Sequence, residues 1–349
     1  MPGRKTVSAA IALLAIVLVA AVLASGLSDF DVSGRDSRQL VFASPAGNLS
    51  GTLLLPASGE TRPPVVIVVH GDGPQDRYSA EGYLPLFNAL LDAGIGVFSW
   101  DKPGIGGSEG DWRDQSMAGR AAEAEAARDA VRRNAGNRAG LIGFLGFSQA
   151  GWVLPRIAAR AGDETFFVLV GGAVNWQRQG DHLTRSRMRQ DGTSDARIAA
   201  EIARQNAAEA ALADVAEGAA RDAAAAALFG VPRERARFIL RNRDADASAD
   251  LQRAGAPFMA IWGKDDLNVD ARTNARDYEQ LLRPNNPANR VVLIPDATHG
   301  LLRARLFNYQ LPQDMPWWAR AAFVLLGRYA YAEGAIATIV DWIRELPAR

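Results

Sequence analysis

Apolar residues along the chain form two kinds of pattern, short continuous runs and longer stretches with helical spacing. The continuous runs are typical of strands that are buried on both faces, as in parallel sheets. They predict strands at residues 39–43, 49–55, 65–69, 95–100, 140–147, 166–170, 258–262 and 291–294. The helical patterns lie between them, at residues 83–92, 117–134, 149–160, 271–282 and 335–346.

The order of these runs and helical patterns determines the expected fold class. The first two strands are joined by a turn-like sequence at residues 44–47 and predict an antiparallel hairpin. From the third strand on, strands and helices alternate, which predicts an α/β fold with a mostly parallel eight-stranded sheet and helices on both faces. Right-handed crossovers would place the carboxyl ends of the strands, and any functional site, along one edge.

Two segments interrupt the alternation. The first covers about residues 175–254, is rich in Ala, Arg and Asp, and has helical patterns at 195–217 and 219–229. A connection this long should carry structure of its own, so it predicts a helical cap inserted over the sheet edge. The second covers residues 306–331 and is aromatic and apolar. It either completes the core, or some of its side chains line an acyl pocket or rest on a membrane, namely Trp317, Trp318, Phe323 and Tyr329.

The amino terminus has an uncharged apolar segment, residues 7–27, shortly after Arg4 and Lys5. Its length is close to the ~20 residues that cross a bilayer as a helix. Residues 1–27 are therefore predicted to be a signal anchor that holds the catalytic domain outside the cytoplasm, or a signal peptide whose cleavage leaves a periplasmic or secreted protein. Residues 28–37 are predicted to be a tether, and the α/β domain to span 38–349.

Composition narrows the classes of function. The chain of 349 residues has 39 basic and 39 acidic side chains, so no global field attracts it to nucleic acid, and no nucleic-acid partner is expected. It has no cysteine, which excludes disulfides, thiolate nucleophiles and cysteine-ligated metal sites. A nucleophile must therefore come from another residue type.

Glycine-rich sequences follow two of the predicted strands. After the strand at 65–69 comes HGDGP, where glycines let backbone N–H groups turn toward a ligand. The N–H of Asp72 in this sequence could stabilise charge on a carbonyl oxygen, as an oxyanion hole does; the alternative is a tight turn without function. After the strand at 95–100 comes DKPGIGGS, which lacks the spacing of a phosphate loop and is interpreted as a structural loop that begins at Asp101.

The candidate nucleophile is Ser148, in the sequence GFLGFSQAG at residues 143–151. Gly146 and Ala150 flank it at positions where larger side chains would collide in a sharp strand-turn-helix, as a nucleophile elbow requires. The same geometry would aim the N–H of Gln149 at the oxyanion and place the serine at the positive end of a helix. Ala150 stands where the usual motif has glycine.

A serine hydroxyl needs a general base that is held in place by an acid. Of the three histidines, His299 follows the last predicted strand and is the candidate base. His70 belongs to the glycine turn, and His182 to a charged part of the cap where a solvated surface position is expected. The acid should follow a strand between nucleophile and base. Asp266 in the sequence GKDD is preferred, and its neighbour Asp265 is the alternative.

Together these sequences resemble the α/β-hydrolase superfamily from residue 39 to the carboxyl end. The residues that carry the resemblance are HGDGP at 70–74, DKPGIGGS at 101–108, GFSQAG at 146–151, GKDD at 263–266 and ATHG at 297–300. Within the superfamily the chain is similar to bacterial serine esterases and to the dienelactone-hydrolase-like and serine-aminopeptidase-like groups. The resemblance implies a triad of Ser148, Asp266 and His299, an oxyanion hole formed by the amides of Asp72 and Gln149, and a lid where the helical insertion falls.

The expected function is that of a serine hydrolase that cleaves a small-molecule carboxylic ester through an acyl-enzyme on Ser148, without a cofactor or metal. The same triad also serves amidases and peptidases, thioesterases and acyltransferases. A catalytically silent binding scaffold at the membrane is a further alternative, which the complete set of Ser, Asp and His disfavours. If the segment at 7–27 is not cleaved, the membrane is an additional partner.

Overall fold

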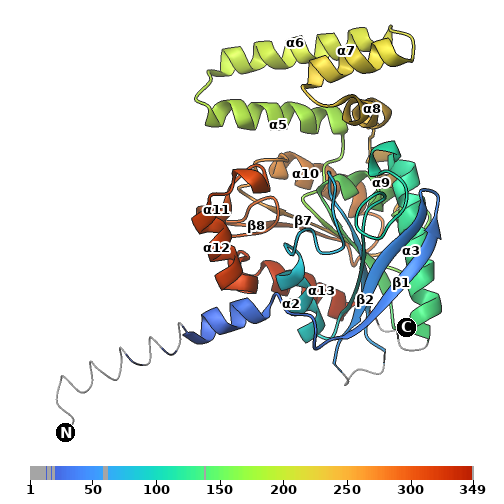
Figure 1. Cartoon of the computed structure of the whole chain (residues 1–349), viewed down its shortest axis with the longest axis vertical. Coiled ribbons are helices and arrows are strands. Elements are labelled where there is room, and N and C mark those ends of the chain that lie inside the picture. The colour runs from blue at the N-terminus through green and yellow to red at the C-terminus, as the bar shows by residue number, and fades with distance from the viewer. Residues whose placement is uncertain (1–12, 14–16, 18–19, 58–61, 137–138, 348–349) are drawn as a thin grey trace, which may run out of the picture.

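A sheet of eight strands forms the centre of the molecule, with helices on both of its faces (Figure 1). This computed structural model describes residues 13, 17, 20–57, 62–136 and 139–347. The strands are β1 (Asp36–Ser44), β2 (Gly47–Leu55), β3 (Val65–Val69), β4 (Gly96–Trp100), β5 (Ile142–Phe147), β6 (Phe167–Val170), β7 (Phe258–Gly263) and β8 (Arg290–Ile294). Each coincides with one of the predicted apolar runs, which confirms the fold class.

The pairing within the described sheet is antiparallel only at its first edge. The strand order is β1-β2-β4-β3-β5-β6-β7-β8. β1 and β2 form the predicted hairpin, with Ser44 opposite Gly47, and β2 pairs antiparallel with β4. From β4 to β8 every neighbouring pair is parallel. The carboxyl ends of these strands therefore meet along one edge of the sheet, where a site is expected.

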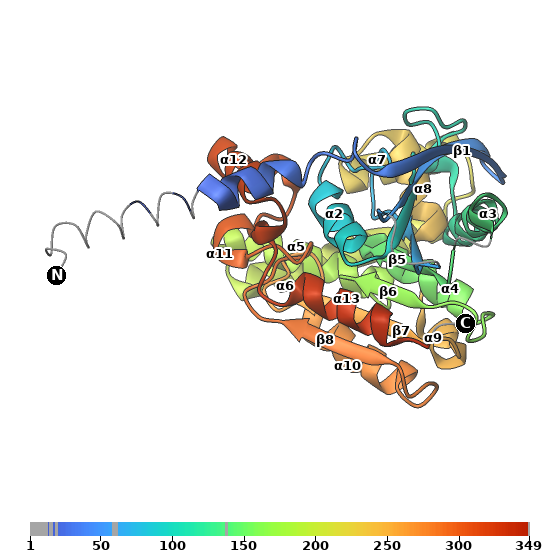
Figure 2. The same cartoon turned by 90° about the horizontal axis from the view of Figure 1, so that it is seen from below.

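Helices of the α/β body cover the sheet, most of them in the connections between strands and α13 after the last strand (Figure 2). They are α2 (Leu84–Asp92), α3 (Met117–Ala135), α4 (Leu154–Ala158), α9 (Ser248–Arg253), α10 (Ala271–Leu282) and α13 (Ala335–Glu345). Side-chain caps explain where two of them begin. Ser116 accepts a hydrogen bond from the N–H of Gly119 at the start of α3, and Asp270 accepts one from the N–H of Thr273 at the start of α10.

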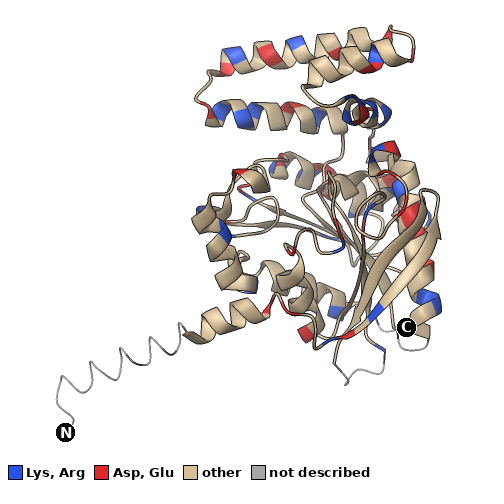
Figure 3. Ribbon diagram, in the orientation of Figure 1, with Lys and Arg blue, Asp and Glu red and all other residues tan. Residues whose placement is uncertain are grey.

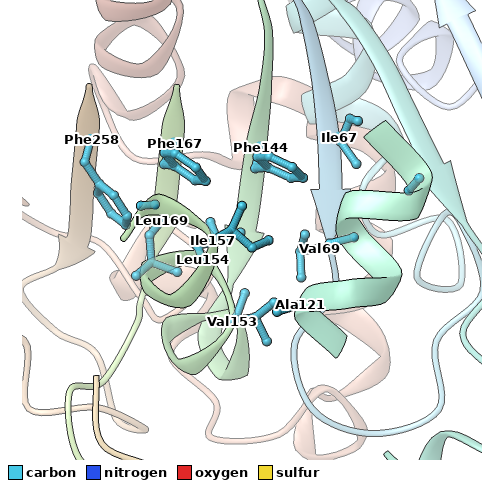
Figure 4. Close-up of a cluster of buried hydrophobic side chains, with 14 of the residues drawn as sticks. Ile67, Val69, Ala121, Phe144, Val153, Leu154, Ile157, Phe167, Leu169 and Phe258 are labelled. Atoms are coloured by element: carbon cyan, nitrogen blue, oxygen red, sulfur yellow. The ribbon is translucent and has the colours of Figure 1, made fainter. Parts of the chain in front are cut away.

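Aromatic side chains on neighbouring strands form a row in the core (Figure 4). Phe144, Phe167 and Phe258 lie side by side on β5, β6 and β7, with ring centroids 5.3 and 5.6 Å apart. Leu154 and Ile157 of α4 cover this row, and all five side chains are at most 1% exposed. Burying each large apolar side chain stabilises the fold by about 1.5–3 kcal/mol, so the row fixes β5 and the turn that follows it.

The chain after β5 differs from the helix that the sequence predicts at 149–160. A 3-10 turn covers Ser148–Trp152, and the regular helix α4 begins only at Leu154. Pro155 is the physical reason, because its nitrogen cannot donate a hydrogen bond to the carbonyl of Gly151 and its ring crowds that carbonyl. Ser148 therefore stands at the start of a short 3-10 helix, whereas the regular helix predicted over 149–160 is confined to Leu154–Ala158.

The connection between β6 and β7 contains helices α5, α6 and α7, which rise above the sheet edge, and α8 at their base (Figure 1). They span Trp176–Gln190, Asp195–Ala213, Ala219–Phe229 and Arg233–Asn242. We call these four helices the cap. α6 and α7 follow the predicted patterns, although α6 ends at Ala213 rather than at residue 217. α5 and α8 were missed because arginine and other polar residues dominate their sequences and obscure the apolar spacing.

The described part of the amino-terminal segment is helical at residues 13, 17 and 20–28. Residues 7–12, 14–16 and 18–19 lie outside the described residues, so the signal anchor or signal peptide stays a prediction. Within the described ranges, no helix is both long and apolar enough to cross a membrane. Residues 28–37 run along the body, where the buried carboxylate of Asp29 accepts hydrogen bonds from the backbone and guanidinium of Arg328.

Candidate active site

Ser148 lies in a sharp turn at the carboxyl end of β5, near the middle of the sheet. Its φ of 51° is in the left-handed region, which residues other than glycine rarely adopt. Gly146 leaves room for the turn, because a Cβ at that position would lie 2.6 Å from Cβ of Ala150 and 2.7 Å from Leu154. This is the geometry of a nucleophile elbow, and it accommodates the methyl group of Ala150.

The HGDG turn after β3 lies directly beside this elbow. A Cβ on Gly71 would be 3.4 Å from Cβ of Ser148. Lys102, which is 2% exposed, donates hydrogen bonds from Nζ to the carbonyls of Gly71 and Gly73, at 3.1 and 2.8 Å. The carbonyl of Gly71 and the N–H of Asp72 belong to one planar trans peptide and point in opposite directions. Lys102 therefore turns the N–H of Asp72 away from itself.

A second buried basic side chain, that of Arg120 of α3, holds both loops at once. Its guanidinium donates a hydrogen bond to the carbonyl of His70 and another, of 2.5 Å, to Oε1 of Gln149. Nε2 of Gln149 in turn donates to Oδ1 of Asp72 at 3.0 Å. Arg120 and Gln149 are 4% and 3% exposed. The two residues whose amides are candidates for an oxyanion hole are thus linked to each other and to one buried guanidinium.

His299 follows β8 and Asp266 follows β7, and their side chains meet at the same sheet edge. Nδ1 of His299 lies 2.8 Å from Oδ2 of Asp266, whose side chain is fully buried. Oδ1 of Asp266 accepts hydrogen bonds from the backbone N–H groups of Asn268 and Val269, at 2.7 and 2.9 Å. Because the backbone fixes the carboxylate, Oδ2 holds the imidazole in one orientation and favours the proton on Nδ1.

Gly171, just after β6, makes room for this imidazole. It has a φ of 64°, and a Cβ there would lie 2.8 Å from Cε1 of His299. Burial lowers the pKa of His299, but the charge of Asp266 and the hydrogen bond to it outweigh burial, so the pKa lies above its ordinary value of 6.5. The arrangement therefore provides an oriented and relatively basic imidazole.

Two other candidates from the sequence lie elsewhere. Asp265 is exposed, and it is Asp266 that contacts His299. His70 is buried with Nε2 2.6 Å from the carbonyl of Trp100, and burial lowers its pKa to about 3. His70 is therefore neutral and belongs to the framework of the glycine turn.

His182 does not have the solvated surface position that the sequence predicts. It is partly buried, and its Nε2 is enclosed without a hydrogen-bond partner in the described part of the chain. The reason is that α5 lies over the start of α10, so His182 faces Asp270 and Thr273. Burial lowers its pKa.

A cavity of about 320 Å³ lies between the sheet edge and the cap, and Ser148, Gln149 and Asp72 are among its lining residues. Much of the cap's contribution to the lining is polar, namely Gln177, Gln179, Asp181, Arg187, Asn206 and Glu209. The aromatic residues of the 306–331 segment do not line this cavity. The interpretation that they form an acyl pocket therefore does not apply to it.

Arg235 of α8 joins the cap to the floor of this cavity. Its guanidinium donates two hydrogen bonds to the carboxylate of Asp72, one of them 2.8 Å long, and lies over the rings of Trp112 and Phe238. Partial desolvation would raise the pKa of Asp72, but Arg235 outweighs it and leaves that pKa below its usual value. Basic side chains are frequent along α5 and α8 (Figure 3).

Sequence reasoning missed the roles of Lys102, Arg120 and Arg235. Lys102 stands in DKPGIGGS and is one of very few lysines in the chain, a rarity that was an available signal. Arg120 and Arg235 are two arginines among many and carry no such signal. Asp101 has the structural role that was expected, since its carboxylate accepts hydrogen bonds from Arg77 and from the backbone of its own loop.

Comparison with known proteins places this arrangement in a family. Residues 66–308, well over half of the chain, match the sequence profile of the alpha/beta hydrolase family. No curated protein matches the sequence. At identities as low as those below, a similar solved structure shows a shared fold and no more.

Three similar solved structures were found, and the two with TM-scores of 0.50 or more illustrate that fold. An esterase from Pyrococcus furiosus is 16% identical with a TM-score of 0.50, over 85% of this chain and 92% of that one. 2,6-Dihydroxy-pseudo-oxynicotine hydrolase is 13% identical with a TM-score of 0.52, and the match covers 89% of this chain and 68% of that one. A thermophilic esterase from Thermogutta terrifontis is 17% identical with a TM-score of 0.48, and the match covers 88% of this chain and 99% of that one. The family match, together with the eight-stranded sheet and its elbow, shows that this chain is a hydrolase that belongs to the alpha/beta hydrolase family.

Proposed function

We propose that the protein is a serine hydrolase that cleaves carboxylic esters through an acyl-enzyme on Ser148. The observation that supports this most strongly is the hydrogen bond between His299 and the fully buried Asp266, at the same sheet edge as the elbow that carries Ser148. A base that is oriented by a buried acid is what a serine hydroxyl needs to become a nucleophile.

In the proposed reaction, Nε2 of His299 accepts the proton of Ser148 while Oγ attacks the ester carbonyl. Asp266 keeps the proton on Nδ1 and stabilises the imidazolium that forms. The amides of Asp72 and Gln149 donate hydrogen bonds to the oxyanion of the tetrahedral intermediate. His299 then gives its proton to the leaving alcohol. A water molecule, activated by the same base, hydrolyses the acyl-enzyme and restores the serine.

The cavity supports a small and polar ester substrate. Its volume of about 320 Å³ is at the small end of the range for ligand pockets, ~300–1,000 Å³. Amide and charged side chains of the cap would remain without partners against a long alkyl chain, and such unpaired groups disfavour binding. We therefore expect p-nitrophenyl acetate and esters of short hydroxy or keto acids to be cleaved faster than p-nitrophenyl octanoate.

The central test is labelling by a fluorophosphonate probe together with hydrolysis of p-nitrophenyl acetate. The wild type should be labelled, and Ser148→Ala should lose both the label and a factor of about 10⁴ or more in kcat. Ser33→Ala, at an exposed serine, is the matched control and should behave as the wild type. A wild-type protein that is not labelled would contradict the serine mechanism. Labelling without ester cleavage would move the proposal to amide or thioester substrates.

A further inference from the structure

Exposed large apolar side chains are concentrated in one part of the molecule. The described residues include eleven large apolar side chains that are exposed. Nine of these belong to the amino-terminal helix or to residues 311–329: Leu13, Val17, Leu27, Leu311, Trp317, Trp318, Val324, Leu325 and Tyr329. We call these nine the apolar surface. The other two, Val41 and Val215, lie apart, on β1 and in the loop between α6 and α7. A patch of this kind is unusual on a monomer and indicates a binding surface.

The two segments that form the apolar surface are packed against each other (Figures 1 and 2). Helix α12 (Trp317–Leu326) approaches the amino-terminal helix so closely that a Cβ on Gly26 would lie 2.1 Å from the carbonyl of Leu325. The rings of Phe30 and Phe323 meet edge to face, with centroids 5.7 Å apart. Arg328 also binds Asp29, so the end of the amino-terminal helix is fixed against this part of the body.

Helix α12 directs its largest side chains outward. Ala319 is its one fully buried residue, whereas Trp317 is 80% exposed and Trp318 is 45% exposed. In a globular helix the indole rings would be expected on the inner face. Tryptophan and tyrosine are enriched at the level of lipid headgroups, because their rings are apolar and carry one polar group.

The neighbouring sequence indicates what covers this surface. The uncharged segment at 7–27 ends where the amino-terminal helix meets α12, and Arg320 is the one charged residue of α12. Lipid accommodates both features, an uncharged segment of this length and a neighbouring helix that carries a single charge. We propose that the apolar surface rests on a lipid bilayer, with the indole rings of Trp317 and Trp318 at headgroup level.

This contact would fix the orientation of the catalytic domain as well as its location. At the cap end of the apolar surface, next to Leu311, Gln310 donates a hydrogen bond to the carbonyl of Leu183, at 3.3 Å. Leu183 lines the cavity above Ser148. The α5 side of the cavity would thus be held close to the bilayer, while β1, on the opposite side of the molecule in Figure 1, would face water.

The absence of cysteine allows a direct test. Trp317→Cys and, separately, Tyr329→Cys would each be labelled with the fluorophore NBD in the full-length chain. Val41→Cys and Val215→Cys are the controls, because they are exposed apolar positions outside the proposed face. The labelled proteins are reconstituted into phosphatidylcholine vesicles, with and without lipids that carry a nitroxide on the headgroup. Circular dichroism spectra and urea unfolding midpoints that match those of the wild type show that each variant is folded.

The expected result is emission from positions 317 and 329 that is blue-shifted, several times brighter and quenched by the nitroxide lipids, while positions 41 and 215 stay in water. Equal quenching at all four positions would overturn the proposed face. A blue shift at 317 without nitroxide quenching would mean that protein covers the surface, and it would overturn the lipid proposal. No change at 317 or 329 would overturn it too. These readouts do not depend on the triad, so their failure is distinct from failure of the proposed reaction.

Discussion

The floor and the roof of the cavity differ in how their polar groups are held. Below it, Arg120, Gln149 and Asp266 are each less than 10% exposed, and each is bound by groups on other elements. Above it, α5 buries one residue, Thr184, and most of the cap's ion pairs are formed by exposed side chains. Exposed ion pairs contribute roughly 0–1 kcal/mol each, whereas breaking a buried network costs several.

This difference suggests a division of roles. Preorganised buried donors stabilise charge that develops during a reaction, because they need no reorganisation at that moment. Phe238 of α8 joins the main core, but the far part of the roof is held by exposed pairs and by a small apolar cluster, Leu212, Ala225 and Ala236, and can change position more easily. We therefore expect substitutions in the floor to act mainly on kcat and substitutions in the roof to act mainly on KM and on substrate preference.

The largest expected effect comes from the acid in the floor. Asp266→Asn keeps the size of the side chain but no longer favours the productive tautomer of His299, so kcat should fall by about 10⁴-fold. Asp265→Asn, one residue away and exposed, should change kcat little. Hydrolysis of p-nitrophenyl acetate measures both. Similar losses in the two variants would argue against the Asp266–His299 pair as the source of catalysis.

A smaller effect is expected for the buried guanidinium of Arg120, which binds the two loops proposed to form the oxyanion hole. Arg120→Met should lower kcat by about 10- to 100-fold with little change in KM. Complete loss of one oxyanion donor lowers kcat by about 10²–10³-fold, and this variant would only misplace the donors. The variant should also be less stable, because Glu123 and two carbonyl acceptors would remain buried without the guanidinium. The measured kcat must therefore be divided by the folded fraction, which urea unfolding provides. The control is Arg128→Met on the same helix, which lies over Phe144 away from the site. An unchanged kcat would remove Arg120 from its positioning role.

The link between roof and floor should give a weaker and different response. Arg235→Gln removes an ion pair to Asp72 whose partners are 22% and 43% exposed, so its contribution is discounted to about 0.5–1 kcal/mol. We expect a two- to fivefold fall in kcat/KM, carried mostly by KM, and a changed preference among acyl groups. Arg237→Gln on the same helix is the control. A loss confined to kcat would mean that Arg235 acts on the oxyanion loop rather than on the cap.

The smallest effect expected is a shift along the pH axis. His299 must be neutral to accept a proton, so kcat/KM should fall as pH drops through its pKa, and because Asp266 raises that pKa the midpoint should lie above 6.5. NMR titration of the three histidines provides an independent measure. One should titrate above 6.5, while His70 and His182, whose pKa values are lowered by burial, should titrate below it. A midpoint below 6.5 would contradict the described pairing.

Most of the sheet could be predicted from the sequence, because strands such as Val65–Val69 are buried on both faces and appear as uninterrupted apolar runs. The elbow and the contact between Asp266 and His299 could be anticipated because each of these residues follows such a run. What could not be predicted depends on contacts between distant residues. The hydrogen bonds of Arg120 to His70 and Gln149 join residues 50 and 29 positions apart, and the pair of Arg235 and Asp72 joins residues 163 apart.

Local patterns also failed where one residue overrides its neighbours. Pro155 breaks the helical pattern after Ser148, which the apolar spacing alone did not reveal. In α5 the arginines and glutamines conceal a helix that buries little, so hydropathy gave no sign of it. Few side chains of α5 are buried, so its sequence shows little apolar periodicity. This is why two of the four cap helices could not be predicted from the sequence.

The left-handed backbone of Ser148 has a consequence for the evolution and engineering of this protein. A residue with a side chain in that conformation costs roughly 1 kcal/mol or more, so the elbow lowers the stability of the fold in order to expose a hydroxyl. Glycine at this position would relieve the conformation and, under the proposed mechanism, give an inactive chain that unfolds no more easily than the wild type. Selection for stability alone would therefore remove the serine, and screens for thermostable variants of this protein must retain an activity assay.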